Sequence, residues 1–278
     1  MKRYVWAIVI IVALVAIYEV LQKWNALPCR YQYIEYKRAY TPQNDTTTYG
    51  TYVVSYPVFS RRIMTDEAVE CINSMVEKIA VQDSVDMDRL SGEFIDACKE
   101  YIDYKKSDVA RYYDDEEAVI PSWYYDSQTY VLINGSKLIV TETEIDSYQG
   151  GAHSNYGSYF ANYDVKTGKM LSIDDVFTDV MAVSEAITRY FIEQYALDDS
   201  TSLSQQGFYV EKHQLPITSN FALLPEGVLF AYNIYEIAPY AFGKSEVTVP
   251  YSALRAVMKY RPDFRKADVI RQEIISEW

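Results

Sequence analysis

The residues best suited to chemistry lie in a loop that begins at Tyr148 and ends at Tyr156. A β-rich run enters it, a Gly150-Gly151 turn follows, and His153, one of only two histidines in the chain, comes next. Three acidic residues precede the loop: Glu142, Glu144 and Asp146. A histidine oriented by a carboxylate can act as a general base, but one beside a Gly-Gly turn is more commonly a structural hydrogen-bonding group. A structural role, contact with a partner, and catalysis therefore all stay open at His153.

A second loop, Tyr235-Glu-Ile-Ala-Pro-Tyr240, has the composition of a rigid aromatic edge. Pro239 stiffens it, and Gly243 permits a tight turn just after it. Either the loop packs Tyr240 onto a sheet, or it pairs with the histidine loop to form a recognition surface, because tyrosines on stiff loops are good binding anchors. The predicted binding residues are Tyr148, Gly150, Gly151, His153, Tyr156, Tyr235, Glu236, Pro239 and Tyr240.

The sequence lacks the common catalytic and metal-binding motifs. It contains no G-x-S-x-G, no H-E-x-x-H, no C-x-x-C and no glycine-rich phosphate loop ahead of a helix. We therefore expect no enzyme activity, no cofactor and no metal. Cys71 and Cys98 fall on two neighbouring predicted helices, where they could form a disulfide or stay as buried core residues.

The composition describes a folded, acidic protein. Its 278 residues are 49% hydrophobic and 23% charged, with a net charge of −13 and 28 tyrosines. Nucleic acid is an unsuitable partner because phosphates require a basic surface. An acidic surface favours cationic partners, although much of this charge could serve solubility alone.

The N-terminus predicts a membrane anchor. Residues Tyr4–Leu21 are almost entirely apolar and follow Lys2 and Arg3. As a helix they would span about 27 Å, enough for a bilayer, with the N-terminus in the cytoplasm. This predicts a single-pass, signal-anchor membrane protein whose bulk is extracytoplasmic, either periplasmic or outside the cell. Cleavage as a signal peptide and lipidation at Cys29 are the alternatives.

Periodicity and turn residues predict an α+β fold with mainly antiparallel sheets, packed helices and two subdomains. Three segments divide the chain: residues 1–25 as anchor, 26–125 as a small α+β domain, and 126–278 as a second α+β domain. Strands are expected near 31–40, 49–59, 125–133, 137–147, 156–165, 221–224, 228–235 and 246–249. Helices are expected from 66, over 87–104, 180–197 and 263–276, with a short one after Ser252.

The order of motifs resembles a known family. The elements are Y-x-G-G-A-H at 148–153, D-x-x-T-G at 164–168, L-x-I-x-D-x-F at 171–177, an aromatic run at 221–243, and V-x-V-P-Y-x-x-L at 247–254. Together they resemble the PdaC/RsiV-like C-terminal domain family of bacterial cell-envelope proteins, over roughly residues 140–260. Residues 31–125 resemble the small α+β domain that usually precedes it.

This resemblance implies an exported recognition module. One relative senses lysozyme, and another carries the same pair of domains ahead of a peptidoglycan deacetylase, whose Asp-His-His metal site is not expected in a chain with only His153 and His213. We therefore expect a membrane-anchored binding or sensor module of the cell envelope, with a basic, lysozyme-like protein as partner. A peptidoglycan- or carbohydrate-binding accessory is the alternative, followed by an enzyme acting on envelope glycan or peptide.

Overall fold

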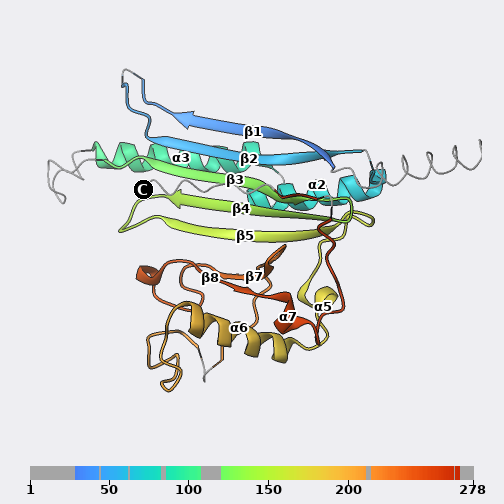
Figure 1. Ribbon diagram of the computed structural model, residues 1–278. Helices are drawn as coiled ribbons and strands as arrows, with labels where there is room; N and C mark the ends of the chain where they lie inside the picture. The colour runs from blue at the N-terminus through green and yellow to red at the C-terminus, as the bar shows by residue number, and fades with distance from the viewer. Residues whose placement is uncertain are drawn as a thin grey trace, which may run out of the picture.

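The computed structural model describes residues 29–269 except 44, 62, 83–85, 108–119, 211–213 and 266. A large mixed sheet forms its centre, with strands in the order β1-β2-β3-β4-β5 and a short β9 beside β3 (Figure 1). The strands are β1 (Arg30–Tyr40), β2 (Gly50–Ser60), β3 (Trp123–Asn134), β4 (Leu138–Tyr148), β5 (Asn155–Asp164) and β9 (Asp268–Val269). All neighbours are antiparallel except β2 and β3, which run parallel. The sheet is therefore mixed, although most of its strand pairs are antiparallel, as predicted.

Two amphipathic helices lie between β2 and β3 in the chain and cover one face of the large sheet. They are α2 (Asp66–Val81) and α3 (Met87–Lys105). The Thr65 hydroxyl caps α2 by accepting from the backbone N–H of Ala68, and Asp86 caps α3 in the same way. Parallel neighbours need a long crossover connection, and this helical pair supplies it.

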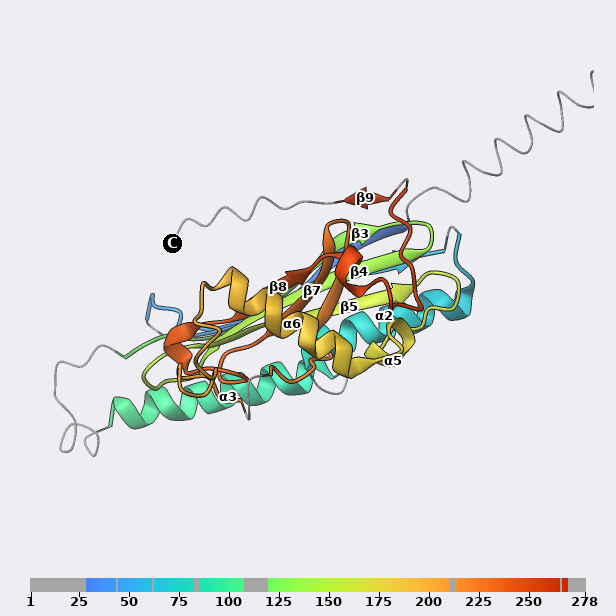
Figure 2. The same cartoon turned by 60° about the horizontal axis from the view of Figure 1, so that its bottom comes forward.

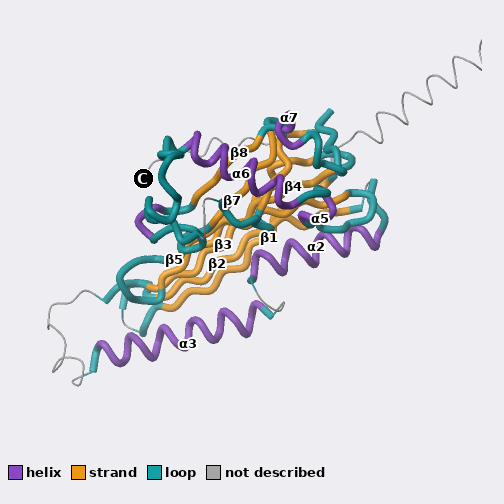
Figure 3. The backbone as a smooth tube through the Cα atoms, turned by 90° about the horizontal axis from the view of Figure 1, so that it is seen from below, coloured by secondary structure: helices purple, strands orange, loops and turns teal. Residues whose placement is uncertain are grey.

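A second, three-stranded antiparallel sheet lies on the other side of the large one. Its strands are β6 (Phe221–Leu224), β7 (Gly227–Tyr232) and β8 (Ser245–Val249). Helix α6 (Val180–Gln194) packs against β8, so the layers run from α6 through the small sheet and the large sheet to α2 and α3 (Figures 2 and 3). Short helices complete this part: α5 (Ile173–Val176), η1 (Tyr240–Phe242) and α7 (Tyr251–Leu254).

Two hydrophobic cores share the large sheet. One lies under α2 and α3, and the other lies between the large sheet, the small sheet and α6. Adjacent residues of β4 divide between them, because Ile139 packs into the first core and Val140 into the second. This burial on both faces explains why the start of β4 is a continuous apolar run.

Asparagine side chains join the small sheet to β5, the last strand of the large one. The amide of Asn162 donates to Phe221 O and accepts from Leu223 N, at 2.7 and 2.8 Å. Asn233 does the same for Ser158, accepting from its N–H and donating to its carbonyl at 2.8 and 3.2 Å. Each buried amide thus replaces a missing strand neighbour, which satisfies backbone groups that would otherwise lack partners.

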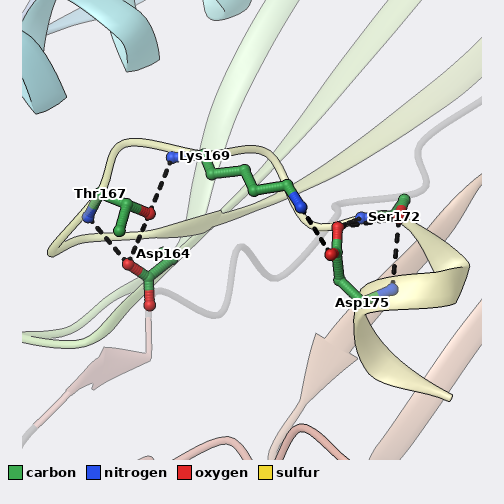
Figure 4. Close-up of polar contacts among 5 residues, drawn as sticks. All are labelled: Asp164, Thr167, Lys169, Ser172 and Asp175. Atoms are coloured by element: carbon green, nitrogen blue, oxygen red, sulfur yellow. Dashed lines mark hydrogen bonds and ion pairs between the residues drawn. The ribbon is translucent and has the colours of Figure 1, made fainter.

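The connection from β5 to α5 is held by its own polar side chains (Figure 4). The Asp164 carboxylate accepts from both the N–H and the hydroxyl of Thr167, each at 2.8 Å. Ser172 and Asp175 then form a capping box at α5, and Lys169 donates to the Asp175 carboxylate. The contacts of Lys169 and Ser172, with Lys169 contributing most, hold the pKa of Asp175 well below its usual range.

The membrane prediction requires a correction. In the part of the chain with described coordinates, no helix combines the length and apolar character needed to cross a bilayer. The predicted span Tyr4–Leu21 lies outside the described residues. For the described residues the fold class is therefore corrected to α+β with no helix suited to span a membrane, and the membrane, signal-anchor and extracytoplasmic assignments are not retained.

The prediction of a C-terminal helix at 263–276 was also wrong for the described residues of that segment. The Asp263 carboxylate accepts from the Arg265 N–H at 3.1 Å, a local bond that competes with helix formation. Residues 268–269 instead form β9 against β3, and residues 270–276 lie outside the described chain.

Cys71 and Cys98 do not form a disulfide, and buried Cys98 donates to Tyr49 O. The predicted domain boundary after residue 125 falls inside β3, and the division into two domains stays a prediction.

Candidate functional site

The two loops singled out by the sequence meet. The ring of His153 stacks on that of Tyr240, with centroids 3.7 Å apart and planes at 20°. The Tyr235 hydroxyl lies 3.1 Å from His153 Nε2, and the Tyr156 ring meets Tyr240 edge-on at 5.7 Å. These four residues, His153, Tyr156, Tyr235 and Tyr240, are called the aromatic rim below.

Backbone conformations that few residues tolerate set the shape of both loops. Gly150 and Gly151 have φ of 88° and 109°, and the Tyr148 hydroxyl closes this turn by donating to Gly151 O at 3.0 Å. Tyr235 itself has φ of 65°, which is rare for a tyrosine and points to a conformation held by its surroundings. Its hydroxyl contact with His153 is one such constraint.

The other predicted site residues lie around the rim in different ways. Tyr148 stacks on Tyr124 at 6.2 Å, one strand away from Tyr156. Pro239 precedes η1 and is exposed, whereas Gly243 ends it with φ of 79°. Glu236 is exposed, and its charge adds to burial in raising the pKa of Tyr159 and Tyr232.

Both ring nitrogens of the histidine have hydrogen-bond partners. Its Nδ1 lies 2.9 Å from the Ser154 carbonyl oxygen, so Nδ1 carries the proton and Nε2 accepts from the Tyr235 hydroxyl. The orienting partner is a carbonyl and not the acidic group expected of a general base. Within the described chain, no group of three or more His, Cys, Asp or Glu side chains could hold a metal ion. His213 lies outside the described residues.

A groove of about 840 Å³ adjoins the rim and was not foreseen. It lies on the face of the large sheet opposite α2 and α3, where Tyr156 is both a rim and a groove residue. Three carboxylates line it: Asp126, Glu144 and Asp146. The tyrosines that line it are Tyr124, Tyr130 and Tyr156.

Strand register places these side chains together. Asp126 of β3 is paired with Asp146 of β4, which is paired with Tyr156 of β5. One step along, Gln128 is paired with Glu144. Since alternate residues share a face, the polar positions of two neighbouring strands form one acidic surface. The alternation itself is visible in the sequence, but pairing Asp126 with Asp146 requires the hairpin register.

The groove has an excess of negative charge. Its one cationic side chain is Lys244, whose ammonium donates to Ser158 Oγ at 2.6 Å and lies 3.9 Å from Glu144. Burial, with Glu144 and Glu246 close by, raises the pKa of Glu142 to about 7. Burial also raises the pKa of Tyr130, with help from Glu144 and Asp126. Such a surface suits a cation.

These features define an α+β protein with an acidic, tyrosine-lined groove. Residues 174–252 match the family described as protein of unknown function DUF3298, so this segment is a DUF3298 domain. It includes the Tyr235–Tyr240 loop, while His153 and the β3–β5 side of the groove lie outside the match. The PdaC/RsiV-like assignment and its small partner domain stay predictions.

Solved structures share the fold across both parts of the chain. A DUF3298 family member from Bacteroides fragilis is 22% identical with a TM-score of 0.66, covering 86% of this chain and 96% of its own. A DUF3298 family protein from Pseudomonas aeruginosa is 18% identical with a TM-score of 0.56, covering 84% and 95% respectively. No curated protein matches the sequence.

Proposed function

We propose that this protein is a non-enzymatic binding module whose groove binds a cationic segment of a partner protein. Basic proteins of the lysozyme type are the leading candidates. The observation that carries the proposal is the row of carboxylates, Asp126, Glu144 and Asp146, set among tyrosine rings in one open groove. Carboxylates attract lysine and arginine side chains, and tyrosine faces bind them further by cation–π contact. The sequence resemblance to the PdaC/RsiV-like family supports the same class of partner.

The aromatic rim gives this groove a preorganised border. The rim residues are already locked together by the His153–Tyr240 stack and the Tyr235 hydrogen bond, so a partner need not order them on binding. Tyr235 is 51% exposed, which leaves its ring available for contact. The charges would then steer association, while the rings supply the contact area.

The test is calorimetric titration with lysozyme at low and moderate salt. The double substitution Glu144→Gln with Asp146→Asn removes two groove charges and should weaken binding by about 5- to 10-fold at low salt. Glu100→Gln with Asp103→Asn is the matched control, because both residues are exposed on α3 and change the net charge equally. We expect the control to bind within about twofold of the unmodified protein.

Two results would overturn this proposal. One is the absence of micromolar binding to lysozyme and to other basic proteins at low salt. The other is an equal loss in the groove and α3 variants, since that would indicate a diffuse charge effect rather than a site. Raising the salt concentration to 500 mM should lower the affinity for a cationic partner below its value at moderate salt.

Glycan binding is the second candidate, with a specific observation in its favour. Tyr124 and Tyr148 stack with planes at 26°, which presents flat aromatic surface next to the Asp146 carboxylate, a pairing suited to sugar rings and hydroxyls. Cosedimentation with purified peptidoglycan distinguishes the two candidates. Retention that survives high salt and is lost in Tyr148→Ala would favour the glycan over the cationic protein.

A further inference from the structure

The end of the molecule away from the aromatic rim has the opposite charge. Helix η1, which carries Tyr240, precedes β8, and α7 follows β8, so the two lie at opposite ends of this strand (Figure 1). From Arg255 to Arg265 the chain has four basic residues and a single acid, in a protein of net charge −13. A basic region so placed in an acidic protein needs its own explanation.

This basic region surrounds a pocket of about 350 Å³. Its walls are largely apolar and aromatic: Pro225, Tyr251, Met258, Pro262 and Phe264. The two rings lie 6.2 Å apart. The hydroxyl of Tyr251 donates to Leu224 O at 2.7 Å, which ties α7 to the end of β6 and fixes the ring. The pocket therefore has a preset floor, and its volume suits a small organic molecule.

Two arginines line the same pocket, and neither has a partner among the described residues. Arg255 and Arg261 are both exposed and make no ion pair or hydrogen bond within the described chain. Neighbouring charges are satisfied, because Asp263 pairs with both Arg265 and Lys137. Glu226 is the nearby acid, and its charge acts on Tyr251. Two unpaired guanidinium groups at one apolar cavity are suited to an anion.

We infer that this pocket binds a small organic anion, a carboxylate attached to an aromatic or short aliphatic body. The body would lie against the Tyr251 and Phe264 rings, and the carboxylate would accept hydrogen bonds from Arg255 and Arg261. Guanidinium groups present paired N–H donors that match both oxygens of a carboxylate. This site is separate from the acidic groove and does not rest on the function proposed for it.

The test uses 3-phenylpropionate as probe, titrated into the full chain and followed by calorimetry. We expect saturable binding, with about tenfold weakening in Arg255→Gln and in Arg261→Gln. Lys259→Gln is the matched control, because it removes the same charge from the same segment at an exposed residue that does not line the pocket. That variant should bind within about twofold of the unmodified protein.

Analogues of the probe separate the two parts of the proposal. The neutral amide of the same acid should bind at least about tenfold more weakly, because it loses both charged contacts. Inorganic sulfate should not compete effectively, since it has no body to fill the apolar floor. No saturation by the acid, an equal loss in Lys259→Gln, or equal binding of sulfate would each overturn the assignment. Circular dichroism of each variant confirms that the fold is intact before binding is compared.

Discussion

The imidazole of His153 lies flat on the phenol ring of Tyr240, although one follows β4 and the other precedes β8. This contact joins the large sheet to the small one at the end of the molecule that carries the acidic groove. It also leaves both ring nitrogens of the histidine in structural hydrogen bonds. The histidine thus fixes the loop that borders the groove.

A double-mutant cycle should detect this contact as coupling. His153→Ala, Tyr240→Ala and the double variant should give an interaction free energy of about 0.5–1.5 kcal/mol in urea unfolding, the range of stacked aromatic pairs. Pairing His153→Ala with Tyr190→Ala, on α6, provides an uncoupled control. Additivity of the His153 and Tyr240 changes would show that the stacking contributes no stability.

Loss of an asparagine bridge should destabilise the fold more than its size suggests. Asn233→Ala leaves the buried N–H and C=O of Ser158 without this partner, so we expect a loss of about 1–3 kcal/mol in the free energy of unfolding. Asn155→Ala removes an amide side chain from an exposed position of β5, the strand that carries Ser158, and should change stability by less than about 0.5 kcal/mol. Equal effects would contradict the bridging role.

Gly168→Ala should be more harmful than Gly207→Ala. Both glycines have positive φ, 73° and 96°, so both changes incur backbone strain of about 1–2 kcal/mol. A Cβ at Gly168 would also lie 2.5 Å from the carbonyl oxygen of Ala68 in α2, whereas nothing lies within 4 Å at Gly207. The difference between the two unfolding free energies measures the clash alone. Equal losses would mean that α2 moves aside.

The half-buried carboxyl of Glu142 should make stability fall as the pH rises. Its pKa is about 7 in the folded chain and about 4.3 when unfolded, so the folded chain holds the proton more tightly between these values. The stabilisation is complete below about pH 4 and is lost as the pH rises through 7. Between pH 5 and 8 the unmodified protein should lose about 2 kcal/mol more than Glu142→Gln does. Parallel pH profiles for the two proteins would refute this assignment.

Local features were predictable from the sequence because they depend on neighbouring residues. The Thr65 cap, the turn at Thr167-Gly168 and the hairpin between β3 and β4 all follow from residues within a few positions of one another. The sequence also suggested that the two loops could meet, because both combine a stiff backbone with aromatic side chains. Tyr235 and Tyr240 do contact His153.

Neither the groove nor the parallel pairing of β2 with β3 could be predicted from the sequence. Asp126 becomes part of the acidic surface only because β3 pairs in register with β4, and that surface stays open only because the small sheet packs elsewhere. Likewise, the chain gives no local sign that β2 lies parallel to β3. Both facts depend on contacts between distant residues, which residue patterns do not specify.

The parallel pairing of β2 with β3 sets how this protein must fold. Gly50 is paired with Trp123, so the β2–β3 ladder can form only after the intervening chain, which includes α2 and α3, has folded back to bring the two strands together. Closing a loop of this length costs chain entropy before stabilising contacts form, and this slows folding. Trp123 stands at the start of that ladder, buried beside Phe94 and Tyr101. Its fluorescence should therefore report the slowest step of refolding, the moment at which the two ends of the crossover become one sheet.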